Sequence, residues 1–119
     1  MPDVPIRIIR ETVTRDELAR IAERQFGDMV KGVVDVSRSI MAVGAELHAD
    51  EEAALLDDGS RQQDLWGINL YPADTGHGFI EYDSMINVRP SQGNRSRGVE
   101  DEALRARIRD VVHQLVTDA

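Results

Sequence analysis

Four segments of this 119-residue chain carry apolar side chains at alternate positions, the pattern of strands that bury one face of a sheet. They span residues 29–37, 40–48, 65–71 and 79–88, and a shorter apolar run covers residues 6–10. Residues 38–39 would form the turn between the first two segments, although one long bent strand is an alternative. The pattern predicts a mostly antiparallel sheet of four to five strands.

Two amphipathic stretches would supply helices to cover the apolar side of this sheet. The first opens at Thr14, which forms an S/T-x-x-E capping box with Glu17. The second repeats apolar residues at helical spacing over residues 101–115, and Asp50 would cap a short helix between them. We therefore expect an α+β fold with the N- and C-terminal helices packed on one face, as a single globular domain over residues 1–119.

Composition narrows the classes of function. The chain has no cysteine, which excludes disulfides, thiolate zinc sites and cysteine nucleophiles. Its formal net charge of -8 argues against nucleic-acid binding, because phosphates would be repelled. The N-terminal residues lack a signal-peptide pattern and no apolar run has the length of a membrane span, so we expect a cytoplasmic protein with no membrane partner.

Polar side chains gather on the side of the predicted sheet opposite its apolar face. They are Asp35, Glu46, His48, Asn69, Glu81, Asp83 and Asn87. Antiparallel sheets commonly keep one solvated face, and that is one interpretation of the pattern. A functional cluster is the other, because the usual lysine and threonine filler is scarce and several carboxylates would lie close together.

Two kinds of chemistry fit that polar face. Glu46, His48 and Asp83 could act as catalytic acid–base groups, with His48 paired to one carboxylate. A divalent metal could instead be held by carboxylates and an imidazole, for which the candidates are Asp35, Glu46, His48, Glu81 and Asp83. The acid–base hypothesis requires that His48 and Asp83 reach one cleft.

The loop RPSQGNRSRG, residues 89–98, is free of acidic residues in an acidic chain. Its arginines can each make two hydrogen bonds to a carboxylate or phosphate. The candidate ligand-binding residues are Arg89, Asn94, Arg95 and Arg97 of the loop, with Asn69 and Asn87 from the strands. The alternative is that the arginines pair with the chain's own acids, at Asp83 or residues 100–102. The loop is not a P-loop, because no lysine follows its glycines.

Three motifs, GAELHADEEAALLDDGS, DLWGINLYP and YDSMINVRPSQGNRSRGVED, resemble a family of small prokaryotic proteins known only as a domain of unknown function. The resemblance extends from about Ile6 to Leu115. It implies a compact single domain, and it supplies neither a reaction nor catalytic residues.

These observations lead to two functional hypotheses. The first is a small protein that binds an anionic ligand at the polar sheet face beside the arginine loop, with hydrolysis or proton transfer as its chemistry. The second is a non-catalytic interaction module or homodimer that uses the same face.

Overall fold

An antiparallel sheet forms the centre of the computed structural model, in the strand order β1-β4-β3-β5-β6. Its strands are β1 (Arg7–Ile9), β4 (Ile40–Val43), β3 (Val30–Asp35), β5 (Leu65–Leu70) and β6 (Ile80–Glu81). The structure describes residues 5–118. Residues 1–4 and residue 119 lie outside the described part. The N-terminal segment in which no signal-peptide pattern was found includes residues 1–4.

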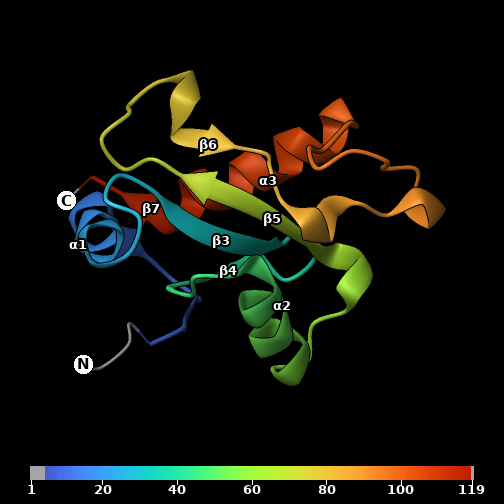
Figure 1. Cartoon of the computed structure of the whole chain (residues 1–119), viewed down its shortest axis with the longest axis horizontal. Coiled ribbons are helices and arrows are strands. Elements are labelled where there is room, and N and C mark those ends of the chain that lie inside the picture. The colour runs from blue at the N-terminus through green and yellow to red at the C-terminus, as the bar shows by residue number, and fades with distance from the viewer. Residues whose placement is uncertain (1–4, 119) are drawn as a thin grey trace.

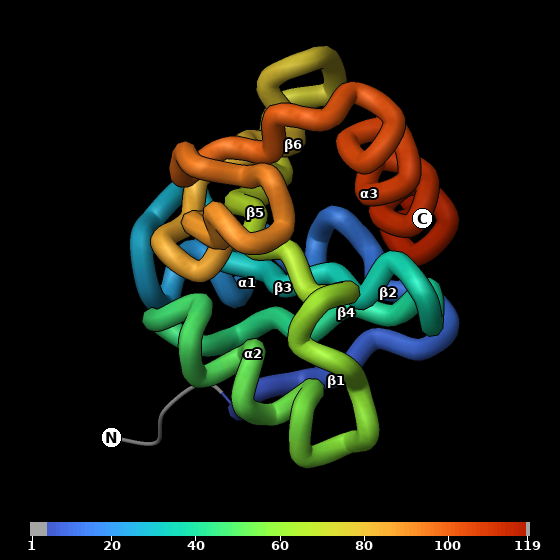
Figure 2. The backbone as a smooth tube through the Cα atoms, turned by 90° about the vertical axis from the view of Figure 1, so that its right-hand side faces the viewer, coloured from blue at the N-terminus to red at the C-terminus, as the bar shows by residue number. Residues whose placement is uncertain are grey.

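Within residues 5–118, three α-helices lie on the two faces of the sheet. α1 (Arg15–Arg24) and α3 (Glu102–Leu115) cover one face, and α2 (His48–Asp57) lies on the other. Figures 1 and 2 show the strands between α2 and α3. The α+β prediction, with the N- and C-terminal helices on one face of an antiparallel sheet, is confirmed. Two short strands, β2 (Val13–Thr14) and β7 (Val116–Thr117), pair in parallel and join the start of α1 to the end of α3.

The main hydrophobic core lies between the sheet and these two helices. α1 contributes Leu18 and Ile21 to it, and α3 contributes Ile108 and Val112. The strands contribute their alternate apolar side chains, which include Val30, Val34, Met41, Val43, Trp66, Ile68 and Leu70. The alternation and the helical spacing in the sequence therefore identified the buried faces correctly.

Local signals set the helix starts as expected for α1 and α3. The Thr14 hydroxyl accepts a hydrogen bond from the Glu17 amide at 3.0 Å, and the Glu17 carboxylate accepts one from the Thr14 amide at 3.2 Å. This reciprocal pair is the predicted capping box. Asp101 caps α3 by accepting from the amide of Ala103 at 2.9 Å.

α2 covers part of the opposite face of the sheet, so the interpretation of that face as a solvated surface is wrong there. A second apolar cluster lies there, formed by Val33, Ile40, Ala42, Leu55 and Leu65. Leu55 belongs to α2, so this helix packs on the face that the sequence pattern had left open. Of the polar residues on this face, Asp35, Asn69 and Asn87 are buried and need internal partners, whereas Glu81 stays exposed.

The predicted strand over residues 79–88 is wrong beyond its start, because only Ile80–Glu81 pairs with β5. The Ser84 hydroxyl then accepts from the Ile86 amide, and residues Met85–Asn87 form a 3-10 turn. The Asn87 side chain accepts from the Gly67 amide at 2.8 Å and donates to the Gly67 carbonyl at 2.9 Å. One side-chain amide thus replaces the missing strand along β5.

The predicted strand over residues 40–48 is also too long. β4 ends at Val43, and Gly44 follows with a φ of 104°, a left-handed conformation that favours glycine. α2 then begins at His48, so its N-cap is Leu47 rather than Asp50, which falls in the first helical turn. His48 therefore belongs to the helix and not to the sheet.

Among residues 5–118, none of the helices has the length and apolar character that crossing a bilayer requires.

Candidate functional site

A row of polar side chains crosses one end of the sheet on the face that α2 covers. Lys31 of β3 pairs with Asn69 of β5, and Asn69 pairs with Glu81 of β6. Directly paired residues of an antiparallel sheet place their side chains on the same face. The first turn of α2 lies over this row, because His48 contacts the backbone of β5 there.

His48 is only 8% exposed, and its Nε2 lies 2.8 Å from the carbonyl oxygen of Ile68. A carbonyl only accepts hydrogen bonds, so Nε2 carries the proton and Nδ1 of the neutral ring keeps a free lone pair. Burial lowers the pKa of His48, and the charge of Lys31 lowers it further. The Ile68 carbonyl, Asp83 and the neighbouring Asn69 oppose this shift. The imidazole is therefore held neutral at physiological pH.

Glu51 lies one turn further along α2 and is fully buried. One carboxyl oxygen, Oε2, accepts from the Ala45 amide at 3.0 Å, while Oε1 has no hydrogen-bond partner in the described structure. Burial raises the pKa of Glu51 well above its usual range, and the Ala45 amide and Lys31 only partly offset this. The folded protein thus favours a neutral carboxylic acid beside the only lysine of the chain.

Asn69 of β5 lies between the first turn of α2 and the edge of the sheet at β6. Its Nδ2 donates to Glu81 at 2.9 Å and to the backbone oxygen of Asp83 at 3.3 Å, which fixes the orientation of the amide. Its Oδ1 is buried and lacks a hydrogen-bond partner within the described residues, although the His48 ring lies next to it. A protonated His48 ring would donate to this atom, whereas with the ring neutral the unpaired acceptor costs about 1–3 kcal/mol and favours a donor from outside the chain.

Arg97 and Asp83 lie at the open edge of the same region. The Arg97 Nε donates to Asp83 Oδ1 at 2.7 Å, and the two side chains are 57% and 43% exposed. This is the internal pairing that the sequence offered as an alternative for the arginine loop. The residues gathered here are named the sheet-end cluster: Lys31, His48, Glu51, Asn69, Asp83 and Arg97. Of the predicted catalytic set, the structure brings together His48 and Asp83.

Arg89 is held inside the chain. Its guanidinium donates to the backbone oxygens of Ile86 and Gln62, each at 2.9 Å, and to that of Leu65. It also stacks 4.6 Å above the Trp66 ring, and Glu52 lies 3.7 Å away. Arg89 therefore anchors the loop onto β5 and α2.

Asn87 and Asn94 likewise use their polar atoms within the chain. Asn87 bonds to both backbone groups of Gly67, and Asn94 donates to the backbone oxygens of Asn87 and Gly98, each at 2.7 Å. The Asn94 Oδ1 accepts from the Glu100 amide at 2.9 Å. These two amides shape the loop from its interior.

Of the remaining predicted residues, Glu81 contacts the cluster through its hydrogen bond from Asn69, and the others are not part of it. Glu46 and Arg95 are exposed. Asp35 caps the β3–β4 turn by accepting from the amides of Ser37 and Arg38, each at 2.9 Å. It stands four residues along β3 from Lys31, about 13 Å at the usual strand rise. Within residues 5–118, no group of three or more His, Cys, Asp or Glu side chains is arranged to hold a metal ion.

Sequence reasoning missed Lys31 and Glu51 as members of the site. Lys31 was not among the predicted site residues, yet it is the only lysine among the fourteen lysine and arginine residues of the chain, and that rarity was a usable signal. Glu51 follows His48 at three-residue spacing, so the two share a helix face. This spacing was hidden by the prediction of a strand through His48.

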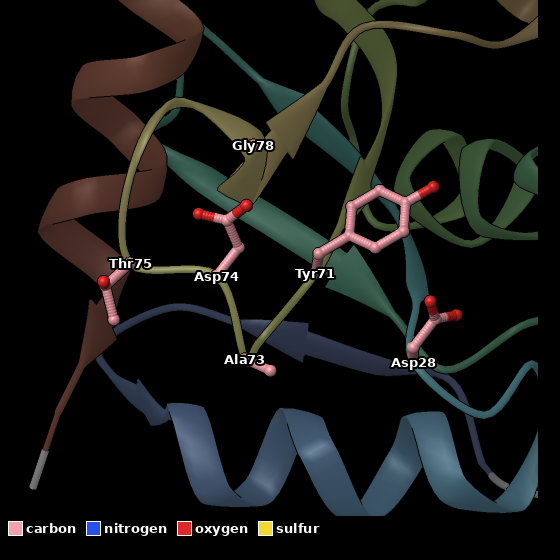
Figure 3. Close-up of a pocket in the computed structure, with 6 residues that line it drawn as sticks. All are labelled: Asp28, Tyr71, Ala73, Asp74, Thr75 and Gly78. Atoms are coloured by element: carbon pink, nitrogen blue, oxygen red, sulfur yellow. The ribbon is translucent and has the colours of Figure 1, made fainter.

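A hollow of about 600 Å³ lies beside Tyr71. Asp28, Tyr71 and Asp74 line it, and Figure 3 shows Tyr71 beside Asp28, with Asp74 further along the connection between β5 and β6. The Tyr71 hydroxyl donates to Glu81 at 3.1 Å, which links the two regions. Burial, the hydrogen bond to Glu81 and the charge of Asp28 raise the pKa of Tyr71. The hollow is therefore acidic, in contrast to the cationic edge of the cluster.

The fold defines a small α+β protein with an antiparallel sheet and a polar cluster between the sheet and α2. The profile of the DUF5674 family, proteins of unknown function, matches residues 7–115, and the chain belongs to this family. The expected resemblance to a domain of unknown function is thereby confirmed. Comparisons with curated proteins and with solved structures gave no match.

Proposed function

We propose that this protein binds a small anionic ligand carrying a hydroxyl group, in the cytoplasm, at the sheet-end cluster. The observation that carries the proposal is the buried Oδ1 of Asn69, which has no hydrogen-bond partner in the described structure and lies beside a neutral imidazole and a lysine. Buried acceptors are nearly always paired, so a ligand hydroxyl would complete this one. Orientation of the amide by Glu81 and Asp83 prevents it from offering its NH₂ group instead.

Two cations would hold the anionic group. Lys31 has no carboxylate within ion-pair distance among the described residues, and its ammonium lies 5.1 Å from the Phe26 ring centroid. Arg97 is bound to Asp83, but the pair is about half-exposed and such pairs contribute only about 0–1 kcal/mol. A phosphate or carboxylate could therefore recruit Arg97 at little cost.

His48 would serve as the acid–base group in this proposal. Its Nδ1 is an acceptor when the ring is neutral, and the ring is held in place by the Ile68 carbonyl. Proton transfer or hydrolysis on a phosphorylated or carboxylated small molecule remains the chemistry that these groups suit best.

The test compares two phosphate ligands, one of which carries a glycerol group with free hydroxyls. Thermal unfolding is measured with glycerol 3-phosphate and with inorganic phosphate, for the wild type, for Lys31→Met and for Arg20→Met. The last variant removes one positive charge from an exposed position on α1. A ligand at 100 times its dissociation constant stabilises by about 2.7 kcal/mol, which is readily measured.

The proposal predicts that glycerol 3-phosphate stabilises the wild type more than phosphate does, and that Lys31→Met loses the effect while Arg20→Met keeps it. Equal stabilisation by both compounds, or equal losses in both variants, would count against the site.

The second candidate function is a homodimer, and exposed apolar residues favour it. Met85 is 65% exposed, Leu56 is 40% exposed and Val88 is 38% exposed. They lie on α2 and on the turn at Met85–Asn87 and its flank, and these two elements pack together. Sedimentation over a concentration series tests this: a mass that stays monomeric at high concentration would argue against it.

A further inference from the structure

A second hollow, of about 380 Å³, lies between α3 and the connection that leads into β6. Arg109 and His113 of α3 form one wall, His77 forms another, and Phe79 and Tyr82 supply aromatic surface. Figures 1 and 2 both place β6 next to α3. This hollow is on the face of the sheet that α3 covers, so it is separate from the sheet-end cluster.

The charge of this hollow is opposite to that of the whole protein. None of its lining residues is acidic, although the chain carries a net charge of -8. Arg105, Arg109 and His113 recur at four-residue spacing, which places them along one face of α3. Within the described residues, Arg109 makes no ion pair with a carboxylate. Its side chain interacts with the Tyr82 hydroxyl, which is neutral, so its charge is available to a ligand.

Aromatic side chains give the hollow an apolar base. Phe79 is 2% exposed, and the His113 ring lies 6.5 Å from it in a tilted arrangement. The Arg15 guanidinium lies over the Phe79 ring, 4.0 Å from its centroid. Tyr82 is half-buried, and its hydroxyl donates to the Arg105 carbonyl at 3.3 Å. The two rings are thus fixed in place before any ligand arrives.

We propose that this hollow is a binding site for a small planar anion, such as an aryl phosphate or aryl carboxylate. The anionic group binds Arg109 through charge-assisted hydrogen bonds, with His113 and His77 as further donors. The planar part rests on the half-buried Tyr82 ring, which the buried Phe79 ring supports from below. Offset contact with aromatic rings and a forked guanidinium together favour such a ligand over a bare anion.

The test is an NMR titration of the uniformly ¹⁵N-labelled full chain with phenyl phosphate. Phenol and inorganic phosphate are titrated in parallel to separate the contributions of ring and anion. The proposal predicts saturable shifts of the amides of Gly76, Ile80 and Tyr82, with weaker binding of both partial probes. Arg109→Gln should weaken phenyl phosphate binding about tenfold, the effect of losing a charged hydrogen-bonding partner. The matched control Arg20→Gln, which removes the same charge from α1, should bind like the wild type.

The proposal is overturned if no saturable shifts occur at these amides, if phenol binds as tightly as phenyl phosphate, or if both arginine variants weaken binding equally. Should the amide spectrum show that Arg109→Gln is unfolded, His113→Ala decides the question. His113 is exposed, so this substitution should leave the fold intact and weaken phenyl phosphate binding about fivefold through loss of one hydrogen-bond donor. An unchanged affinity would refute the site.

Discussion

Replacing Asn87 with alanine should destabilise this protein strongly, because its side chain takes the place of a strand beside β5. The substitution removes the bonds to the Gly67 amide and carbonyl, at 2.8 and 2.9 Å, and a third to the Arg97 carbonyl at 3.0 Å. Gly67 is buried, so water cannot easily replace the lost amide. Two unpaired buried backbone groups at about 1–3 kcal/mol each give an expected loss of about 4 kcal/mol. That is a large share of the free energy of unfolding of a typical domain, which is roughly 5–15 kcal/mol.

The assay is urea unfolding followed by circular dichroism, with the free energy of unfolding taken from the midpoint at constant slope. The melting temperature should fall by about 15 °C, given about 4 °C per kcal/mol for a chain of this size. Met85→Ala is the local control, because it alters an exposed side chain in the same turn and should stay within about 0.5 kcal/mol of the wild type. A loss below about 1 kcal/mol in Asn87→Ala would refute the idea that this amide substitutes for a strand.

Three further predictions concern the same face of the sheet. Gly67→Ala would place a Cβ atom 2.5 Å from the Ser84 Cβ, so it should cost about 1–3 kcal/mol in urea unfolding, with partial recovery in combination with Ser84→Gly. Burial raises the pKa of Glu51, so its contribution to stability is fully present below the ordinary glutamate pKa and is lost as pH rises toward the folded value. Glu51→Gln should therefore match the wild type near pH 4 and exceed it in stability at neutral pH, and a parallel pH profile would disprove the neutral carboxyl. Asp83→Asn breaks the pair with Arg97, and because both side chains are about half-exposed, calorimetry should show a loss of less than about 1 kcal/mol.

Periodic elements were predictable because their signals are local. The capping box at Thr14 and the apolar spacing of α3 determine those helices within a few turns of sequence. The valine-rich β3 and the LWGINL segment of β5 were equally clear. Each of these elements buries the face that its pattern indicated, so the main core followed directly.

The remaining structure depends on contacts between distant residues. The alternation over residues 79–88 is that of a strand, but Asn87 bonds to Gly67, twenty residues away, and that contact bends the chain into a turn. Similarly, α2 packs on the second face through Leu55, which no local pattern distinguishes from a surface leucine. The burial of His48 and Glu51 follows from that packing alone.

Assigning the side chains of each predicted strand to one of its two faces located part of the candidate site. His48, Asn69 and Asp83 do gather at one end of the sheet, and Arg97 pairs there with Asp83, as one of the two interpretations of the arginine loop had it. Arg89, Asn87 and Asn94 turned out to be engaged inside the chain, because a loop that must pack against a sheet edge uses its polar groups to satisfy buried backbone.

The most direct test of ligand binding at the sheet-end cluster uses the only lysine of the chain. Reductive methylation with ¹³C-formaldehyde labels Lys31 and the N-terminal amine while preserving both charges, and the Lys31→Met spectrum assigns the Lys31 signal. Titration with glycerol 3-phosphate should shift the Lys31 signal to saturation, with the same dissociation constant that thermal unfolding gives. A Lys31 signal that stays fixed while the ligand stabilises the protein would contradict the proposed site.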